Sequence, residues 1–197
     1  MLRLPRLGLP MVALLVSLPV VGALAIGCAS DSDAGAQSGG RAAKPLTSVG
    51  WSSFTYPSAC FTTGSPEPVP VHGGKATGPD GIITMSVAAP VFGDVNGDGV
   101  PDAAITYRCI GANASPDTLL VYVATEAGPR LVATLLRGQE IYVQQIRPTG
   151  TGLTVTGIGY SAGAPHCCPD ENVRLDYRWS HGGLVLDRQQ RTPRPQS

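Results

Sequence analysis

Apolar and polar residues alternate between positions 173 and 180 of the chain. The apolar side chains stand at every second position, with polar side chains between them: Val173, Leu175, Tyr177 and Trp179 against Arg174, Asp176, Arg178 and Ser180. Because successive side chains of a β-strand point to opposite faces of a sheet, this pattern predicts a strand with one buried face. Shorter alternations at 83–87 and 153–156 predict the same. The unbroken apolar run at 119–123 predicts a strand buried on both faces.

Glycine and proline interrupt the rest of the chain. The 197 residues include 25 glycines and 18 prolines, which break helices and favour tight turns. Turn residues separate the expected strands at 96–99, 128–129, 148–150 and 180–183. Further strands are expected at 103–110 and 140–146, whereas 131–136 fits a strand and two turns of helix equally well. We therefore expect a mainly β fold with little helix: a single antiparallel β-meander domain, as a twisted sheet or small sandwich, over 49–190.

The N-terminal segment has the layout of an export signal. Arg3 and Arg6 precede an uncharged and largely apolar stretch at 7–30. Leu24-Ala-Ile-Gly-Cys28 resembles a lipobox, the sequence in which a bacterial signal peptidase cuts before a cysteine that receives diacylglycerol. We expect 1–27 to be a lipoprotein signal peptide and Cys28 to be the lipidated first residue of the mature chain. An uncleaved transmembrane helix is the alternative, since about 20 apolar residues span a bilayer.

The segments that flank the expected domain are predicted to lack a core of their own. Residues 28–48 are rich in alanine, glycine and serine, and we expect a flexible tether there. Residues 191–197 are expected to be a disordered tail. The domain would then be held by its lipid at the extracytoplasmic face of the cell membrane. Basic and acidic residues number 14 each, so the chain lacks the positive charge of a nucleic-acid-binding protein.

Oxygen-bearing side chains recur at every second position from 94 to 98, and again at 102. Gly99 permits a sharp bend, and calcium prefers a shell of oxygen ligands. The stretch resembles the calcium loops of dockerin, integrin-type FG-GAP and thrombospondin-like repeats. That resemblance implies five ligands, namely the side chains of Asp94, Asn96, Asp98 and Asp102 and the carbonyl of Val100. An ordinary turn held by side-chain hydrogen bonds, with no ion, is the alternative.

Four cysteines lie beyond Cys28, and an even number in an exported domain predicts two disulfides. They are Cys60, Cys109, Cys167 and Cys168. A bridge between neighbouring residues strains the peptide between them. We therefore expect Cys167 and Cys168 to pair with different distant partners, Cys60 or Cys109. A metal or thiol redox site at His166, Cys167 and Cys168 is the alternative, although zinc sites space their thiolates further apart.

A serine stands within Gly159-Tyr-Ser-Ala-Gly163, which matches the nucleophile-elbow pattern of α/β-hydrolases. Asp176 and His181 follow Ser161 in the order of a catalytic triad. The elbow requires a helix directly after the serine, and Pro165 and Pro169 are incompatible with one. The match is therefore expected to be accidental. We predict that His181, like His72 in a glycine-rich stretch, is a solvated loop residue.

Several of these segments together resemble the LppP/LprE family of actinobacterial lipoproteins. The segments are Ser58-Ala-Cys60, the acidic loop 94–102, Cys109, Ser115-Pro-Asp-Thr-Leu-Leu-Val-Tyr122, Ala164-Pro-His-Cys-Cys-Pro169 and Tyr177-Arg-Trp179. The resemblance covers most of the expected domain. It implies a lipid-anchored envelope protein and carries no catalytic residues with it.

The leading functional prediction is a non-enzymatic binding or structural module of the cell envelope. Its ligand or partner is not named by the residues, and a structural calcium ion is expected at the acidic loop. Two alternatives come from other classes: a serine hydrolase that uses Ser161 with His181 or His166, and a metal-binding or thiol redox protein.

Overall fold

The computed structural model describes residues 43–62, 64–111 and 115–195. The expected signal peptide and Cys28 lie outside the described residues. Two short 3-10 helices, η1 and η2, precede twelve strands: η1 Leu46–Ser48, η2 Trp51–Ser53, β1 Thr55–Ser58, β2 Glu67–Pro70, β3 Lys75–Thr77, β4 Thr84–Val87, β5 Val91–Gly93, β6 Asp102–Ile110, β7 Thr118–Thr125, β8 Gly128–Leu135, β9 Tyr142–Pro148, β10 Gly152–Gly159, β11 Glu171–Ser180 and β12 Gly183–Pro193. The mainly β prediction is confirmed.

The strands pair antiparallel in three sheets. β1 and β2 form a hairpin, β3-β4-β6-β7-β8 form a larger sheet in which β5 also pairs with β6, and β12-β11-β10-β9 form a four-stranded meander. Most neighbours in a sheet are also neighbours in sequence, which short turns allow. Residues 131–135 of the ambiguous stretch at 131–136 belong to β8, and Leu136 follows it with a φ of 67°, so the helical alternative is wrong.

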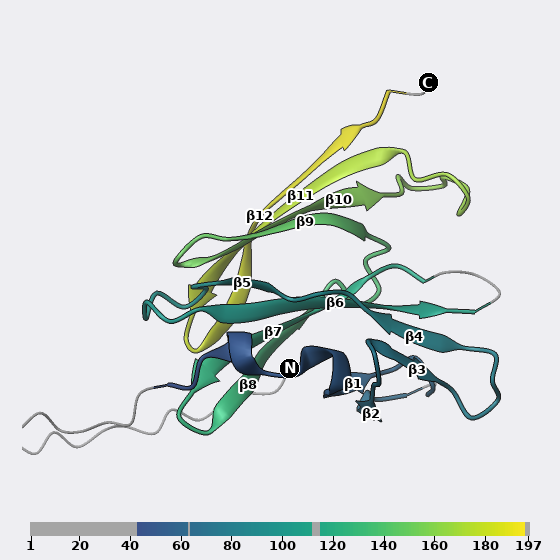
Figure 1. Cartoon of the computed structure of the whole chain (residues 1–197). Coiled ribbons are helices and arrows are strands. Elements are labelled where there is room, and N and C mark those ends of the chain that lie inside the picture. Colours follow the sequence, from purple (N-terminus) through teal and green to yellow (C-terminus); the bar gives the residue numbers. More distant parts are fainter. Residues whose placement is uncertain (1–42, 63, 112–114, 196–197) are drawn as a thin grey trace, which may run out of the picture. The chain divides into compact units, whose positions relative to one another are not determined.

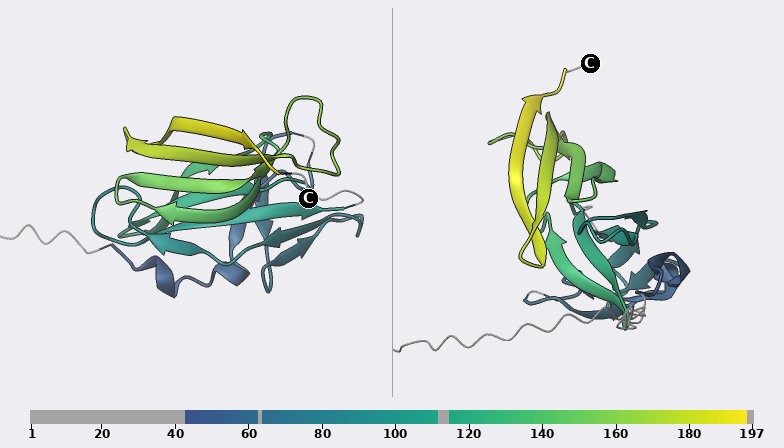
Figure 2. Two further views of the ribbon diagram at one scale, coloured as in Figure 1. Left: turned by 90° about the horizontal axis from the view of Figure 1, so that it is seen from above. Right: turned by 90° about the vertical axis from the view of Figure 1, so that its left-hand side faces the viewer.

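The larger sheet is the middle of three layers (Figure 1). On one of its faces, Ile105 and Tyr122 pack in a core with Leu46, Trp51 and Tyr56 of the N-terminal segment of the fold, which here means residues 44–60 with η1, η2 and β1. On its other face, a second core joins it to the four-stranded sheet: Ala104, Leu119 and Val121 with Leu153, Val155, Val173, Leu175 and Tyr177. Figure 2 shows the four-stranded sheet stacked on the middle sheet from two further directions.

The hydrophobic patterns of the sequence correspond to these layers. In β7, Leu119 and Leu120 are both fully buried although they point to opposite faces, which confirms the strand predicted to be buried on both sides. In β11, Val173 and Leu175 are buried and Arg174 is exposed, which confirms the strand predicted to have one buried face.

The folded region extends beyond the expected bounds of 49 and 190. Leu46 is fully buried in η1, and the backbone N–H of Lys44 donates to the carbonyl of Thr125. At the other end, β12 continues to Pro193. The predicted tether therefore ends before residue 44, because one leucine among alanine and serine residues is enough to anchor the segment when a sheet offers a buried face.

Candidate functional site

Asp94 organises the first half of the acidic loop. Its Oδ1 accepts a hydrogen bond from the backbone N–H of Gly97 at 2.7 Å, and its Oδ2 accepts one from Gly99 at 3.0 Å. Both glycines have a left-handed backbone, with φ of 84° and 80°, which residues with a Cβ rarely adopt. The alternation of glycine and acidic residues in the sequence thus produces a curl around one carboxylate.

Asn96 and Asp98 continue the same pattern. Asn96 Oδ1 accepts from the backbone N–H of Asp98 at 2.9 Å, and Asp98 Oδ1 accepts from that of Val100 at 2.8 Å. The Asn96 amide also donates to Asp98 Oδ2 at 2.8 Å. These are the side-chain hydrogen bonds expected of an ordinary turn.

Asp102, the last of the five residues predicted as calcium ligands, has a different environment. It is fully buried, its Oδ2 accepts from the backbone N–H of Val95 at 3.0 Å, and its Oδ1 accepts from that of Ala124 at 3.0 Å. Burial raises the pKa of its carboxyl group, and the two N–H donors oppose that rise. Through these two hydrogen bonds, the buried carboxylate of Asp102 links the start of the loop to β7.

The five residues predicted as calcium ligands differ in how accessible their oxygen atoms are. A carboxylate has about four lone-pair sites, so Asp94 and Asp98 retain acceptor capacity beside their hydrogen bonds. Asn96 and the Val100 carbonyl add neutral oxygens. Asp102 differs from Asp94 because it is fully buried and its two N–H donors, Val95 and Ala124, are buried with it. In the part of the chain that the structure describes, no group of three or more histidine, cysteine, aspartate or glutamate side chains is placed to hold a metal ion.

The disulfides do not follow the expected pairing. Cys60 is bonded to Cys109, with their Cα atoms 5.3 Å apart, and Cys167 is bonded to its neighbour Cys168. Cys109 lies in β6, opposite Met85 of β4, and Cys60 follows β1 in the core on the same side of the sheet. Cys167 and Cys168 lie in the β10–β11 loop of the four-stranded sheet, which belongs to another layer. The prediction of two distant pairs is wrong because the layers keep the two sets of cysteines apart.

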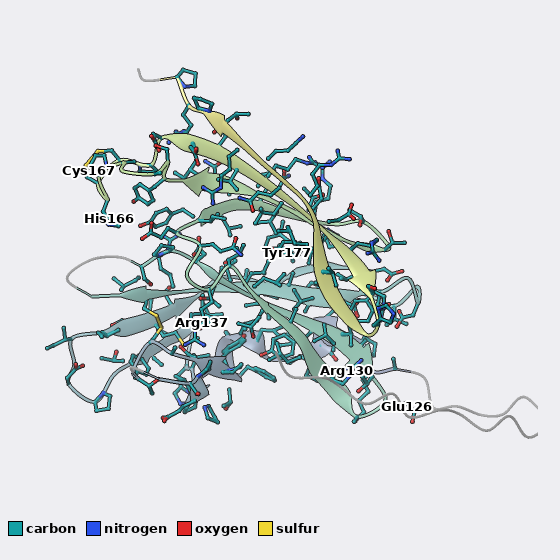
Figure 3. All side chains as sticks on the ribbon, turned by 180° about the vertical axis from the view of Figure 1, so that it is seen from behind. Glu126, Arg130, Arg137, His166, Cys167 and Tyr177 are labelled. Carbon is teal, nitrogen blue, oxygen red and sulfur yellow. A yellow bond between two sulfur atoms is a disulfide. The ribbon has the colours of Figure 1, made fainter. Side chains whose placement is uncertain are left out.

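His166, Cys167 and Cys168 are all exposed in the β10–β11 loop. Figure 3 shows His166 and Cys167 at the loop, beyond the part of the sheet that carries Tyr177. His166 Nδ1 lies 3.7 Å from Glu140 Oε1, and the Tyr160 hydroxyl donates to the His166 carbonyl at 2.6 Å. Because the two cysteine sulfurs are bonded to each other, neither is a thiolate able to ligate a metal in this state.

Ser161 is held by a carboxylate at the base of the same loop. Its hydroxyl donates to Asp170 Oδ2 at 2.5 Å, and its backbone N–H donates to Asp170 Oδ1 at 2.7 Å. The Ser161 hydroxyl and backbone N–H both lower the pKa of Asp170. The structure does not assemble the triad pattern, since His181 lies in the turn at the opposite end of β11, where its Nδ1 is 2.8 Å from Ser180 Oγ. Asp176 bonds Thr154 and Arg174 instead.

An ion pair that the sequence analysis missed joins the two larger sheets. Arg108 of β6 donates from Nε and Nη2 to the two carboxylate oxygens of Asp117, at 3.1 and 2.8 Å. Asp117 Oδ2 also accepts from the backbone N–H of Val143 in β9 at 2.7 Å. The Arg108 guanidinium lies 5.0 Å from the centre of the Tyr142 ring. No sequence signal distinguishes these charged residues from solvated ones.

Aromatic rings extend from this ion pair toward the β10–β11 loop. Tyr142 and Tyr160 have ring centres 6.2 Å apart, and those of Tyr160 and His166 are 5.8 Å apart. A hydrogen bond with the Tyr142 side chain raises the pKa of Tyr160 to about 12. The cluster thus connects the Arg108–Asp117 ion pair with His166 of the loop through ring contacts.

Cavities of different sizes open on the surface. The first, of 430 Å³, lies between the N-terminal segment and the region after β4 and is lined by Val49, Trp51, Val87, Pro90 and Phe92 among others. The second, of 280 Å³, lies beside Arg108 and Asp117. Another, of 170 Å³, lies beside Cys60 and Phe61. A smaller one, of 80 Å³, lies on the outer face of the four-stranded sheet and has only polar side chains around it.

Comparison of the chain with protein-family models, with curated proteins and with solved structures gives no match. The resemblance to the LppP/LprE lipoproteins therefore stays a prediction. Among the described residues, no helix combines the length and apolar character needed to cross a bilayer.

Proposed function

We propose that this protein is a lipid-anchored module of the bacterial cell envelope, acylated at Cys28, that binds a ligand or partner without catalysing a reaction. The observation that carries the extracytoplasmic location is the Cys60–Cys109 disulfide, because such bonds persist in oxidising compartments and are rare in the cytosol. The lipobox-like segment that ends at Cys28 supports anchoring by acyl chains.

The arrangement around Ser161 supports a binding role over the hydrolase alternative. The serine hydroxyl faces the Asp170 carboxylate, and His181 is separated from it by the length of β11, a strand of 10 residues. Ten residues of strand span about 33 Å, which no side chain bridges. We expect Ser161→Ala to leave any ester or peptide turnover of the purified protein unchanged.

Calcium is proposed as a structural addition at the acidic loop, held by Asp94, Asn96, Asp98 and the Val100 carbonyl. Calcium should raise the melting temperature and a chelator should lower it, since an ion that binds only the folded state stabilises that state. Asp98→Asn should remove the calcium effect, whereas Asp187→Asn, at an exposed carboxylate of β12, should retain it. Equal melting temperatures with calcium and with chelator would contradict the proposed ion and would mean that the loop is an ordinary turn.

The anchor is tested by fractionation of cells that express the full-length chain. The wild-type protein should be found in the membrane fraction and carry metabolically incorporated fatty acid. Cys28→Ser should abolish fatty-acid incorporation, while Cys60→Ser, which retains the lipobox-like segment, should not. Equal labelling of the wild type and Cys28→Ser would overturn the proposed anchor.

A further inference from the structure

The outer face of the four-stranded sheet is open. Along β10 and β11, Val155 and Leu175 point into the core, so Thr154 and Arg174 point outward. This face lies on the far side of the three layers from the N-terminal segment (Figure 1). In the part of the chain that the structure describes, no strand or helix covers it.

A hollow of 80 Å³ lies on this face. Strands β9, β10 and β11 supply its side chains, which are Gln145, Arg147, Thr154, Thr156 and Arg174. The strand register explains why they meet: Arg147 pairs with Thr154, and Thr156 pairs with both Gln145 and Arg174. At about 30 Å³ for each water molecule, the volume suits a group of a few heavy atoms.

The two arginines of the hollow differ in their partners. Arg174 donates to both oxygens of Asp176, at 3.2 and 2.8 Å, and lowers the pKa of that carboxyl group. Arg147 is exposed and has no hydrogen-bond or ion-pair partner among the described residues. The hollow therefore presents one guanidinium fixed by Asp176 and one unpaired guanidinium, with the Thr156 hydroxyl and the Gln145 amide beside them, whereas the Thr154 hydroxyl donates to Asp176.

This combination of groups suits an oxyanion. Guanidinium groups bind phosphate and carboxylate through paired N–H donors, and such charge-assisted hydrogen bonds are stronger than neutral ones. No carboxylate is part of the lining itself, and the Asp176 carboxylate beside it accepts hydrogen bonds from Thr154 and Arg174. Two more arginines of the same face, Arg178 of β11 and Arg188 of β12, lie beyond the hollow, and Arg178 is 3.7 Å from Asp187.

We propose that this hollow binds a phosphate group of a linear anionic polymer. The proposal rests on the binding role proposed above and names its ligand class. A polymer is favoured over a lipid headgroup because the chain enters the fold through the opposite layer, where Lys44 bonds Thr125 and Leu46 is buried. A polymer would also reach Arg178 and Arg188, which a single phosphate in the hollow does not.

The test is a calorimetric titration of the full-length protein in detergent with inorganic phosphate and with long-chain polyphosphate at low salt. The wild type should bind polyphosphate more tightly than phosphate. Arg147→Gln should weaken both by about tenfold, since a charged hydrogen bond contributes about 1.5 kcal/mol or more. The control is Arg130→Gln, which removes an exposed arginine of β8 in the middle sheet and should change neither affinity (Figure 3).

Three results would overturn the proposal. Absence of polyphosphate binding removes the ligand class, and equal loss with Arg147→Gln and Arg130→Gln shows that only net charge matters. Equal affinities for phosphate and polyphosphate remove the polymer and leave a single-phosphate ligand such as a headgroup. Because the titration does not involve Cys28, a failed anchor and a failed anion site give separate results.

Discussion

The middle sheet and the four-stranded sheet are both antiparallel, yet they differ in how many faces they bury. β7 of the middle sheet has seven of its eight residues buried, whereas β11 buries only alternate residues along part of its length. The middle sheet also carries the Cys60–Cys109 bond, which joins it to the N-terminal segment. The difference teaches that the middle sheet supports the fold, while the four-stranded sheet has a free face available for recognition.

Removal of the two disulfides, one at a time, should give the largest difference in stability between the middle sheet and the four-stranded sheet. Cys60 and Cys109 are 49 residues apart, so their bond restricts a long loop of the unfolded chain. We expect the double variant Cys60→Ala/Cys109→Ala to lose about 4 kcal/mol of unfolding free energy in the chain-entropy model. The bond between Cys167 and Cys168 closes almost no loop, so the double variant Cys167→Ala/Cys168→Ala should lose less than about 1 kcal/mol of unfolding free energy. Urea unfolding measures both, and equal losses would contradict the assignment of support to the middle sheet.

Truncation of core side chains should show the next largest difference in unfolding free energy between the two sheets. Leu119→Ala and Leu120→Ala remove fully buried side chains from opposite faces of β7, and each should cost about 2–5 kcal/mol. In β11, Leu175→Ala should cost a similar amount, but its neighbour Arg174→Ala should change stability by less than about 0.5 kcal/mol. A small effect at either leucine of β7 would mean that one face of the middle sheet is not a core.

Asp102→Asn tests a polar group inside the middle sheet and should have a smaller effect. An amide has one acceptor oxygen, so its NH₂ group would face the N–H of Val95 or Ala124, at a cost of about 1–3 kcal/mol. Asp187→Asn, at an exposed carboxylate of the four-stranded sheet, should change stability little. Chemical unfolding at neutral pH measures the two variants side by side.

The buried carboxyl group of Asp102 should also make the free energy of unfolding depend on pH. Because burial places the pKa of Asp102 above its unfolded value, the folded protein binds more protons than the unfolded chain between those two values. The contribution of Asp102 to the free energy of unfolding therefore falls as pH rises through that window. Asp102→Asn should remove this fall. An identical pH profile for wild type and variant would show that Asp102 is not its source.

Sequence patterns predicted which faces the longer strands bury, but neither the division into three sheets nor the contacts between them. The apolar run at 119–123 and the alternation at 173–180 determine how many faces each strand buries, because side-chain direction follows from strand geometry alone. Four short strands were not predicted, because prolines interrupt β1 and β2 and because β3 and β5 have only three residues each. The turn hydrogen bonds of the acidic loop also agree with its local sequence, since they join residues at most five positions apart.

The contacts that were missed depend on distant residues. Asp102 accepts a hydrogen bond from Ala124, 22 positions away, and Asp117 bonds Val143, 26 positions away. The pairing of Cys60 with Cys109 likewise depends on how the strands are ordered in the sheet. A charged residue or a cysteine has the same local sequence whether it lies in solvent or between sheets, so only the folded arrangement distinguishes these cases.

The bond between Cys60 and Cys109 also determines how the protein responds to a mechanical load. A pull on the N-terminus acts first on Lys44 and then detaches η1, η2 and β1 one after another from the sheet beneath them. At Cys60 the covalent bond transfers the force to β6, in the centre of the molecule. The segment between the two cysteines, which contains β2 to β5 and most of β6, is therefore outside the path of the force and does not extend while the bond is intact.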